Sequence, residues 1–431
     1  MQVLVTGATG LIGSALLARL RQEGHEVVGV ARNPRGRQTA LAADRWIALD
    51  FAQATRPEDW LPHLAGIDAV VNCAGLLQDA ADNALQAVHV DGVAALAEAC
   101  ARAGVRRLIH ISAIGADRKP LSDFSRTKQE GETALMARDL DWVILRPSVV
   151  IGRNAYGGSA LFRGLAAFPR IVPMMPETGL LQVVHMDDLL ATIVFFLQPD
   201  APRRCALDIA GPQRLSMSEI VRGYRSWLGF GPARFVKLPS WTAAIMYRFG
   251  DFVGWLGWPT PIRSTARREM IRGAIGDPDE WTRLTGIMPR TFAAALAAEP
   301  ASVQERWFAR LYLLKPLIFG VLALFWISTG ILAIGPGYEH GDGLMHEGGA
   351  GAIAPLAIIG GGLLDLAIGA GIAYRRTTRI ALLVSLAVSL LYAVIGTILV
   401  PRLWVDPLGP MMKIWPIMVL TVVALAIRED R

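Results

Sequence analysis

Three glycines near the start of the chain have the spacing of a diphosphate site. Gly7, Gly10 and Gly13 follow the apolar segment QVLVT at residues 2–6 and open an amphipathic stretch that ends near Gly24. A strand, a glycine turn and a helix in this order let the backbone approach a pyrophosphate, which lies at the amide end of the helix. This context disfavours the alternative of a glycine turn that binds nothing. The residues expected to contact a dinucleotide here are Gly7, Thr9, Gly10, Leu11, Ile12 and Gly13.

A basic residue follows the next apolar run. The segment EVVGVA at 26–31 leads into Arg32, where domains that prefer NAD place an acid for the ribose 2′-hydroxyl. Arg32, with Arg35 and Arg37 nearby, can instead pair with a 2′-phosphate. The sequence therefore predicts that NADP(H) is favoured over NAD(H). A solvated arginine at a strand end is the alternative.

The elements that must position these residues alternate along the chain. Strand-like runs at WIALD, AVVNCAG, RLIHISA and WVILRPSVVIG are separated by helical stretches, which predicts an α/β fold with a doubly wound parallel sheet. Ligands bind at the carboxyl ends of such strands. We therefore expect Asp50 and Phe51 to face the adenine, and Asn72, Ala74 and Gly75 to lie beside the nicotinamide ribose.

Several motifs together resemble the short-chain dehydrogenase/reductase superfamily, in its extended and atypical branches. TGATGLIG, NCAG, ISAIGA, LRPSVVIG and VVHMDDL stand in that order between residue 3 and about residue 230. Ser112, the stretch SRTKQEGE at 125–132 and the apolar tail are most similar to the nucleotide-binding accessory subunit of respiratory complex I and its bacterial relatives. The resemblance implies a Rossmann domain with a small substrate-side lobe, here at about 153–182 and 205–305.

The resemblance also implies catalytic roles for Ser112 and Lys128, and cofactor contacts for Lys128 and Pro147. The chemistry of the superfamily needs a tyrosine four residues before the lysine, one helical turn away, so that the ammonium lowers the phenol pKa. The segment here is FSRTK, and Phe124 has no proton to give. We therefore do not expect ordinary ketone reduction. The alternatives are a solvated Lys128 and a turn-forming Ser112.

Three further features lie between residues 153 and 305. Tyr156 is expected to pack or to cover a substrate cavity. His185 is interpreted as structural because it lacks an evident acid or nucleophile partner, and Asp187 or Asp188 is expected to cap the helix that follows. Residues 238–261 hold three tryptophans and few charges. This pattern suits either a buried core helix or a face that docks on lipid and a groove for a prenyl chain.

Charge and cysteine content exclude several classes of function. The net charge is +6, but Lys and Arg are scattered among acids without a basic run, so nucleic acid is not an expected partner. Cys73, Cys100 and Cys205 are odd in number and far apart, which indicates reduced thiols in a cytosolic compartment rather than disulfides or zinc. Because Met1 leads directly into a strand, no secretory signal is expected.

The last part of the chain has the composition of a membrane domain. Hydrophobic residues make up 53% of the sequence, and charges nearly vanish from the apolar blocks after about Lys315. We predict a domain at 1–305 and a membrane domain at 306–431, with spans at about 316–337, 352–374, 380–401 and 408–427. Basic residues flank the spans on one side, which places both termini and the nucleotide domain in the cytoplasm of a bacterial-type inner membrane. Such short-looped helices resemble the DoxX-like membrane family.

Two polar features interrupt this apolar part. Asp365 lies inside the second span, where a proton or quinone role competes with an interhelical hydrogen bond, and we favour the hydrogen bond slightly. The outer loop GYEHGDGLMHEGG is rich in glycine, so we expect a solvated loop and no metal site. Its possible metal ligands are Glu339, His340, Asp342, His346 and Glu347.

These observations lead to three functional hypotheses. The first is a membrane-anchored NAD(P)H-binding protein that acts on or senses a lipophilic redox partner such as a quinone. The second is that nucleotide binding is structural and the protein assists the assembly or stability of a respiratory complex. The third is an epimerase-like or dehydratase-like enzyme with a different acid. The expected partners are a pyridine nucleotide, membrane lipid, and a quinone or respiratory complex.

Overall fold

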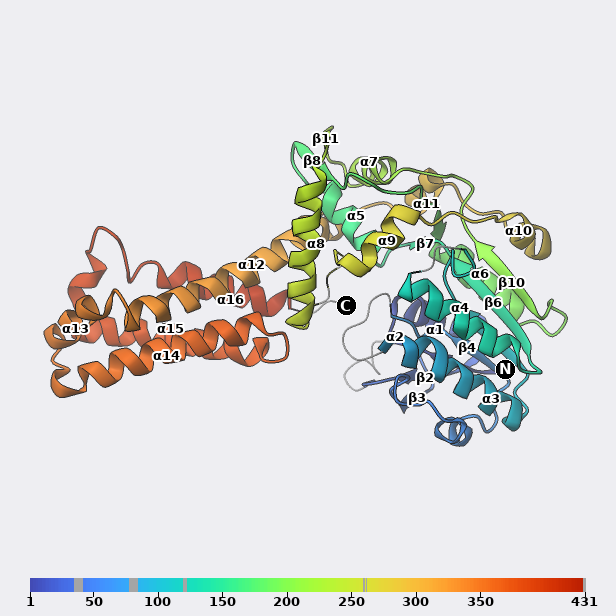
Figure 1. Cartoon of the computed structure of the whole chain (residues 1–431), viewed down its shortest axis with the longest axis horizontal. Helices are drawn as coiled ribbons and strands as arrows, with labels where there is room; N and C mark the ends of the chain where they lie inside the picture. The colour runs from blue at the N-terminus through green and yellow to red at the C-terminus, as the bar shows by residue number, and fades with distance from the viewer. Residues whose placement is uncertain (35–41, 77–83, 119–121, 259, 261, 429–431) are drawn as a thin grey trace. The chain divides into compact units, whose positions relative to one another are not determined.

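The computed structural model describes residues 1–34, 42–76, 84–118, 122–258, 260 and 262–428, and Figure 1 shows its elements. The chain forms two compact units. The first, called the nucleotide unit below, comprises Met1–Asp251 and Pro261–Ala309, and the second, the membrane unit, comprises Phe252–Thr260 and Arg310–Arg431. The main boundary lies between Ala309 and Arg310, and the segment Phe252–Thr260 groups with the membrane helices rather than with the part of the chain that precedes it.

A parallel sheet forms the centre of the nucleotide unit, as the alternating pattern predicts. Its strand order is β10-β6-β5-β4-β1-β2-β3, and all neighbours pair in parallel. The seventh strand is a difference from the sequence interpretation, which assigned residues 205–209 to the lobe. The strands are β1 (Gln2–Thr6), β2 (Glu26–Ala31), β3 (Arg45–Ala48), β4 (Ala69–Asn72), β5 (Arg107–Ile111), β6 (Asp141–Pro147) and β10 (Cys205–Ile209).

Helices cover both faces of this sheet (Figure 1). On one face, α1 (Leu11–Gln22) and α6 (Met186–Phe196) bury leucines and Phe196 against β1 and β4. On the other face, α3 (Gly92–Ala103) and α4 (Asp123–Met136) pack on the same strands, with two short 3₁₀ turns at Pro57–Asp59 and Leu61–His63 beside them. Two apolar cores result, and the doubly wound architecture is confirmed.

The helical stretch between β4 and β5 contains an irregular turn. It runs from α2 (Ala84–Gln86) through a π-helical segment, Ala87–Asp91, into α3. Such π turns occur frequently at functional sites because they redirect side chains. Here the turn carries the buried side chain of His89.

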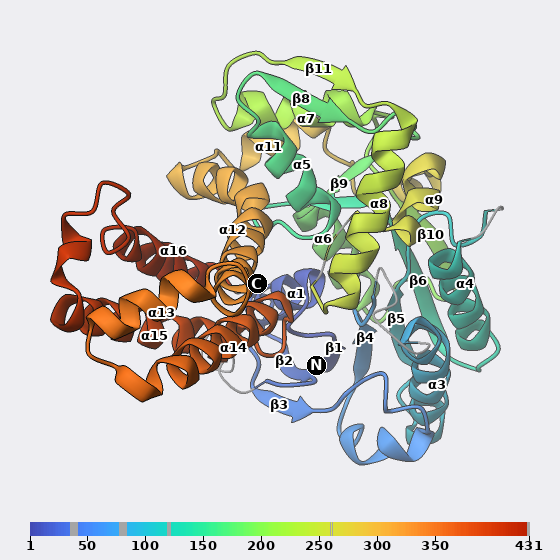
Figure 2. The same cartoon turned by 60° about the vertical axis from the view of Figure 1, so that its left-hand side comes forward.

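The substrate-side lobe contains two small parallel pairs, β7 with β9 and β8 with β11, and six helices in its described part (Figure 2). Helices α5 and α7 pack on each other, and α7 begins with a capping box in which Ser216 and Glu219 exchange hydrogen bonds. The lobe elements are β7 (Val149–Ile151), α5 (Gly158–Ala166), β8 (Ile171–Met174), β9 (Val183–His185), α7 (Met217–Trp227), β11 (Arg234–Lys237), α8 (Ser240–Trp255), α9 (Ser264–Arg272), α10 (Asp279–Thr285) and α11 (Phe292–Ala298).

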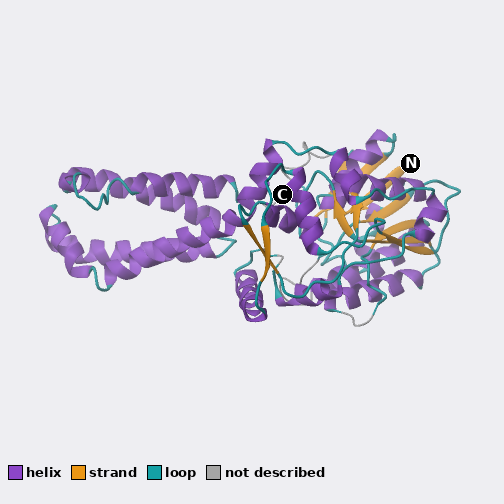
Figure 3. Ribbon diagram, turned by 90° about the horizontal axis from the view of Figure 1, so that it is seen from above, coloured by secondary structure: helices purple, strands orange, loops and turns teal. Residues whose placement is uncertain are grey.

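The described part of the membrane unit contains helices joined by turns and loops, and no strand (Figure 3). Helices α14 and α15 pack on each other, α16 packs on α15, and their shared core includes Phe319, Trp326 and Leu382. The elements are α12 (Val303–Ile334), α13 (Tyr338–Glu347), a 3₁₀ turn (Gly351–Ile353), α14 (Ala354–Ala373), α15 (Thr378–Leu399), a 3₁₀ turn (Pro401–Trp404) and α16 (Ile414–Ala426).

Three helical segments of the described chain are long and apolar enough to cross a membrane: Val303–Ile334, Gly351–Ala373 and Thr378–Leu399. The first three expected spans are therefore matched. The fourth apolar segment is helical only over Ile414–Ala426, which is about 20 Å long at the rise of an α-helix and shorter than a bilayer core. Large apolar side chains such as Leu356 and Ile398 are 75% and 71% exposed on these helices, as expected for surfaces in contact with lipid.

The two polar features of this unit have structural partners. The Tyr392 hydroxyl donates to Asp365 Oδ1 at 3.1 Å, which agrees with the favoured interhelical hydrogen bond. The outer loop was expected to be solvated and irregular, but Tyr338–Glu347 forms helix α13. Its Glu347 carboxylate pairs with Arg402 at 2.5 Å, and the described residues contain no group of three metal ligands.

Candidate functional site

The glycine turn has the geometry of an anion site. Gly7 adopts φ +61°, and a side chain there would place its Cβ 2.7 Å from the Cys73 carbonyl oxygen. A Cβ at Gly13 would overlap the carbonyl oxygen of Gly7, which lies against the helix start. Gly10 donates to that same oxygen at 2.8 Å and is the N-cap of α1. Thr9 lies in the turn, between Gly7 and the helix.

The amide end of α1 is open to a charged ligand. Helix α1 starts at Leu11, directly after Gly10, and Ile12 lies in its first turn. No side chain of the described residues caps the first N–H groups, and the first turn carries no acid. An uncapped helix start favours an anion through its free amides and its dipole. These residues fit the diphosphate of a dinucleotide.

The residues at the strand ends divide into ligand candidates and structural residues. Asn72 is fully buried: its Oδ1 accepts from the Thr6 hydroxyl at 2.6 Å and from the Ala74 amide at 3.0 Å. Its amide nitrogen lies 3.1 Å from His110 Nδ1. Asn72 therefore ties β1, β4 and β5 together at the edge of the sheet where a cofactor binds. Gly75 lies beside the lysine of the site, with a Cβ position 3.3 Å from Lys128 Nζ.

The expected adenine and 2′-phosphate residues are found beyond β2 and β3. Arg32 is exposed one residue after β2, and Asp50 follows the end of β3 and accepts from the Ala52 amide at 3.1 Å. The ring of Phe51 is buried against Trp60 at 5.3 Å, so it belongs to the core. Arg35 and Arg37 lie outside the described residues. The contacts of Arg32, Asp50 and Phe51 with a cofactor stay predictions.

Ser112, Phe124 and Lys128 are brought together by β5 and α4. The Lys128 ammonium donates to the Ile111 carbonyl at 3.0 Å, directly before Ser112. The Ser112 hydroxyl is buried and has no hydrogen-bond partner among the described residues. An orphaned buried hydroxyl is costly unless a ligand completes it. Pro147, at the end of β6, accepts from the Ile114 amide at 3.2 Å and so borders the same strand ends.

Histidine 89 was not identified from the sequence and lies against the aromatic residue of the site. Its Nε2 accepts from the Leu76 amide at 3.1 Å, so its proton is on Nδ1, which lies 2.9 Å from the Thr127 hydroxyl. The ring meets Phe124 edge to face at 5.5 Å. Burial, with a contribution from Lys128, lowers the pKa of His89 to about 2. A histidine that is neutral at every ordinary pH cannot supply the proton that Phe124 lacks.

Burial also changes the lysine. It lowers the pKa of Lys128 from 10.5 to about 8, while Glu132, one turn further along α4, acts in the opposite direction. Burial raises the pKa of the Cys73 thiol to about 12, so this cysteine is no acid or nucleophile at neutral pH. Lys128 is therefore the titratable group of the site closest to physiological pH.

Helix α9 fixes the start of the helix that carries Lys128. Glu269 accepts from the Ser125 hydroxyl at 3.0 Å, and the Arg272 guanidinium donates to the same hydroxyl at 2.7 Å. Ser125 is buried on α4, one residue after Phe124. No pattern in the sequence indicated this contact, because the partners are about 145 residues apart and neither Glu269 nor Arg272 belongs to a motif.

His185 and Tyr156 lie on either side of α5 in the sequence, and the structure gives the surroundings of both. His185 is the N-cap of α6: its Nδ1 accepts from the Asp187 amide at 3.2 Å and lies 2.8 Å from the Arg290 guanidinium, which supports a structural role. The expectation that Asp187 or Asp188 caps this helix was wrong, because both lie in its first turn. Tyr156 is 41% exposed in the loop before α5.

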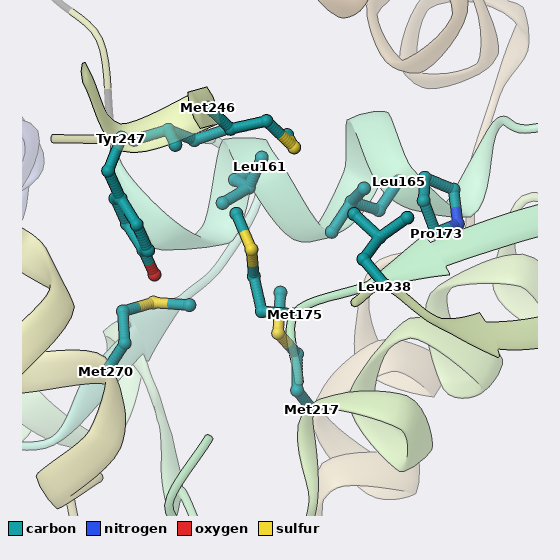
Figure 4. A pocket seen from close by; sticks show the side chains of 10 residues that line it. Leu161, Leu165, Pro173, Met175, Met217, Leu238, Met246, Tyr247 and Met270 are labelled. Atoms are coloured by element: carbon teal, nitrogen blue, oxygen red, sulfur yellow. The ribbon is translucent and has the colours of Figure 1, made fainter. Parts of the chain in front are cut away.

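An apolar cavity lies within the lobe (Figure 4). It contains about 460 Å³ of free space, counted with its opening to solvent. Among its ten lining residues the phenol of Tyr247 supplies the side-chain oxygen, and four methionines make the wall adaptable in shape. The lining residues are Leu161, Leu165, Pro173, Met175, Met217, Leu238, Met246, Tyr247, Ile262 and Met270.

Comparison with known proteins identifies the family of this site. The family model for NAD dependent epimerases and dehydratases matches residues 3–205. Ceramide reductase from Caulobacter vibrioides is 30% identical over 245 residues, which cover 55% of this chain and 74% of that protein. The chain belongs to the NAD dependent epimerase/dehydratase family. A DoxX-like family model matches residues 323–422.

Two further relatives of this epimerase/dehydratase family member agree with the resemblance seen in its motifs. The mitochondrial 40 kDa subunit of NADH-ubiquinone oxidoreductase from Neurospora crassa is 26% identical over 221 residues, covering 50% of this chain and 57% of the subunit. The enzyme WbmG from Bordetella bronchiseptica, solved with NAD, has a TM-score of 0.56 at 19% identity and covers 72% of this chain and 96% of WbmG. At this identity the likeness to WbmG shows the fold alone.

Proposed function

We propose that this membrane-anchored family member binds NAD(P)H and reduces a lipophilic quinone held in the lobe. The observation that carries the proposal is the cavity of Figure 4, whose wall offers hydrocarbon and sulfur but no charged side chain among the described residues. A wall of this kind favours an apolar ligand, because a charged or sugar-like ligand would lose its hydration without gaining partners.

The missing phenol favours a quinone over a simple ketone as the acceptor. A nicotinamide bound at the sheet edge would supply the hydride. Hydride addition to a ketone leaves an alkoxide about as basic as hydroxide. The pKa of its alcohol is roughly 16, so a nearby acid is needed. Hydride addition to a quinone leaves a phenolate-type oxygen, whose phenol has a pKa of about 10 like that of tyrosine, and this oxygen takes its proton from water. Phe124 is compatible with the second reaction.

The residues of the site have defined tasks under this proposal. Lys128 holds the ribose hydroxyls, and the unpartnered Ser112 hydroxyl donates to the acceptor carbonyl. Helix α9 links the two ends of the site, since Met270 lines the cavity while Glu269 and Arg272 hold Ser125 of the lysine-bearing helix. A lipophilic ligand and a nucleotide can therefore influence the same pair of helices.

Cofactor preference and topology belong to the same proposal. The exposed Arg32 after β2 supports NADP(H), through charge-assisted contact with the 2′-phosphate. Basic residues at Arg310, Lys315, Arg375 and Arg379 flank the first three apolar helices on one side, which supports a cytoplasmic nucleotide unit in a multi-pass inner-membrane protein.

A second candidate is a nucleotide-binding assembly or stability factor for a respiratory complex. The neutral His89 packed on Phe124 favours it, because this arrangement fills the place of the missing acid with two groups that do not titrate at ordinary pH. This candidate predicts tight nucleotide binding without hydride transfer.

The test uses the full-length protein in proteoliposomes with NADPH or NADH and a ubiquinone. We expect quinone-dependent nucleotide oxidation, and Met246→Glu should raise the KM for a long-tailed quinone about tenfold, because it introduces a carboxylate into the cavity wall. The matched control is Met288→Glu, at a methionine that is 75% exposed, and it should leave the KM unchanged. Bound nucleotide without any quinone-dependent oxidation would reject the enzyme and favour the assembly factor.

A further inference from the structure

Helix α8 has two apolar faces, although one is enough to pack it. Its inner face carries Ala243, Tyr247 and Gly250, which are buried, and Met246 and Tyr247 line the cavity. Gly250 packs so closely that a side chain there would overlap the Ile262 carbonyl. This face accounts for the attachment of the helix to the lobe.

The outer face presents a row of large exposed side chains. Trp241, Ile245 and Phe249 are 65%, 58% and 64% exposed, and Phe252 and Trp255 continue the row at 55% and 77%. At 3.6 residues per turn, these positions fall within an arc of about 120° opposite the buried face. We call this row the α8 outer face. Monomeric proteins rarely leave such a row of aromatic residues in water.

Charge on the α8 outer face is of one sign. Arg248 is exposed between Ile245 and Phe249. The nearest acid on the helix, Asp251, is turned aside, with its carboxylate 3.6 Å from Arg263 and accepting from the Ser264 amide at 3.1 Å. An arginine among aromatic rings suits a surface that carries phosphate groups at the edge of hydrocarbon.

The C-terminal end of α8 leads directly to the end of a membrane helix. Trp258, three residues after α8, donates from Nε1 to the carbonyl of Ala373 at 2.7 Å, and its ring packs on Phe319 at 4.7 Å. The Leu256 carbonyl accepts from the Arg375 amide at 3.1 Å. Ala373 is the last residue of α14, so this contact lies at the boundary where the apolar helix gives way to the arginines of the following turn.

We propose that the α8 outer face lies in the headgroup layer of an anionic bilayer, with Arg248 on lipid phosphate and its aromatic rings at the acyl boundary. Tryptophan and phenylalanine are favoured at this depth, and the row ends three residues before Trp258, which is held at the end of α14. The inner face of the same helix lines the cavity, so α8 contributes to both surfaces. This surface does not depend on the proposed reaction.

The test places a photoreactive benzoylphenylalanine at single positions of the full-length protein in nanodiscs of phosphatidylcholine and phosphatidylglycerol. Ile245 is the test position. Leu324, on α12 and 65% exposed, is the positive control, and Met136, on α4 and 41% exposed, is the negative control. After irradiation we expect lipid adducts at Ile245 in a yield close to that at Leu324 and severalfold above that at Met136.

Other outcomes overturn the proposal. A yield at Ile245 no higher than at Met136 would show that the face lies in water, and a crosslink from Ile245 to a second copy would assign it to an oligomer interface. Omitting phosphatidylglycerol should lower the adduct yield at Ile245 severalfold, and Arg248→Gln should remove this dependence on lipid charge. A yield that ignores lipid composition in the parent protein would refute the role of Arg248.

Discussion

The carboxyl edge of the main sheet and the cavity of the lobe offer opposite surfaces to a ligand. At the sheet edge, Asn72 hydrogen-bonds with Thr6 and with His110, and the first amides of α1 have no side-chain cap. In the lobe, the cavity wall contains one side-chain oxygen, that of Tyr247. The first surface suits a large charged ligand, and the second suits hydrocarbon. The difference indicates two ligands of unlike polarity rather than one extended polar ligand.

The largest effect is expected from closing the polar surface alone. Gly13→Val should abolish detectable nucleotide binding, because its side chain overlaps the Gly7 carbonyl and displaces the turn. Isothermal calorimetry on the purified full-length protein measures this loss. Ala18→Val, at an exposed position of the same helix, is the control and should bind normally. Binding retained by Gly13→Val would show that the turn is not the nucleotide site.

Restoring the phenol tests whether the polar surface lacks only an acid. Phe124→Tyr should raise the rate of simple ketone reduction about 100-fold over that of the parent protein, which is the contribution of one positioned acid. Nucleotide affinity should not change. The double variant Phe124→Tyr with Lys128→Met should lose the gained activity, since the buried ammonium lowers the pKa of a neighbouring phenol. Substantial ketone turnover by the parent protein would contradict the account of Phe124.

Reversing the charge after β2 tests which nucleotide the polar surface prefers. Arg32→Asp should weaken NADP(H) binding about tenfold, which is the effect of one charge-assisted contact. NAD(H) binding should stay equal or become stronger. Dissociation constants for both nucleotides test this result. Arg283→Asp, at a side chain 73% exposed on α10, should change neither constant. An unchanged NADP(H) constant in Arg32→Asp would leave Arg32 as a solvated residue.

The smallest effect concerns pH and separates the two surfaces again. As pH rises through about 8, Lys128 loses its charge, so nucleotide affinity should fall severalfold, while binding in the apolar cavity should not respond. In the unfolded chain the lysine keeps its proton up to its ordinary pKa of 10.5. The free energy of unfolding should therefore gain a contribution between about pH 8 and 10.5 that Lys128→Met lacks. Equal pH profiles of affinity in parent and variant would contradict this role.

Much of the fold was predictable because its signals are local. The apolar run before Gly7, the glycine spacing and the turn-long distance from position 124 to Lys128 depend on neighbouring residues, and the structure has β1, α1 and α4 at those places. The long apolar helices follow from composition in the same way. Helix α13 was missed because its glycines suggest a loop. In the structure, the ion pair between Glu347 and Arg402 holds the end of this helix, and the 3₁₀ turn Gly351–Ile353 connects it to α14.

The sequence by itself determined six of the seven sheet strands, the glycine turn, the absent phenol and the apolar helices, since each is a matter of residue type and short spacing. Only the tertiary structure decided that His89 is neutral, that Glu269 and Arg272 hold the lysine-bearing helix, and that methionines from distant elements line one cavity. Burial and pairing depend on segments more than a hundred residues apart, and no local pattern encodes which of them meet.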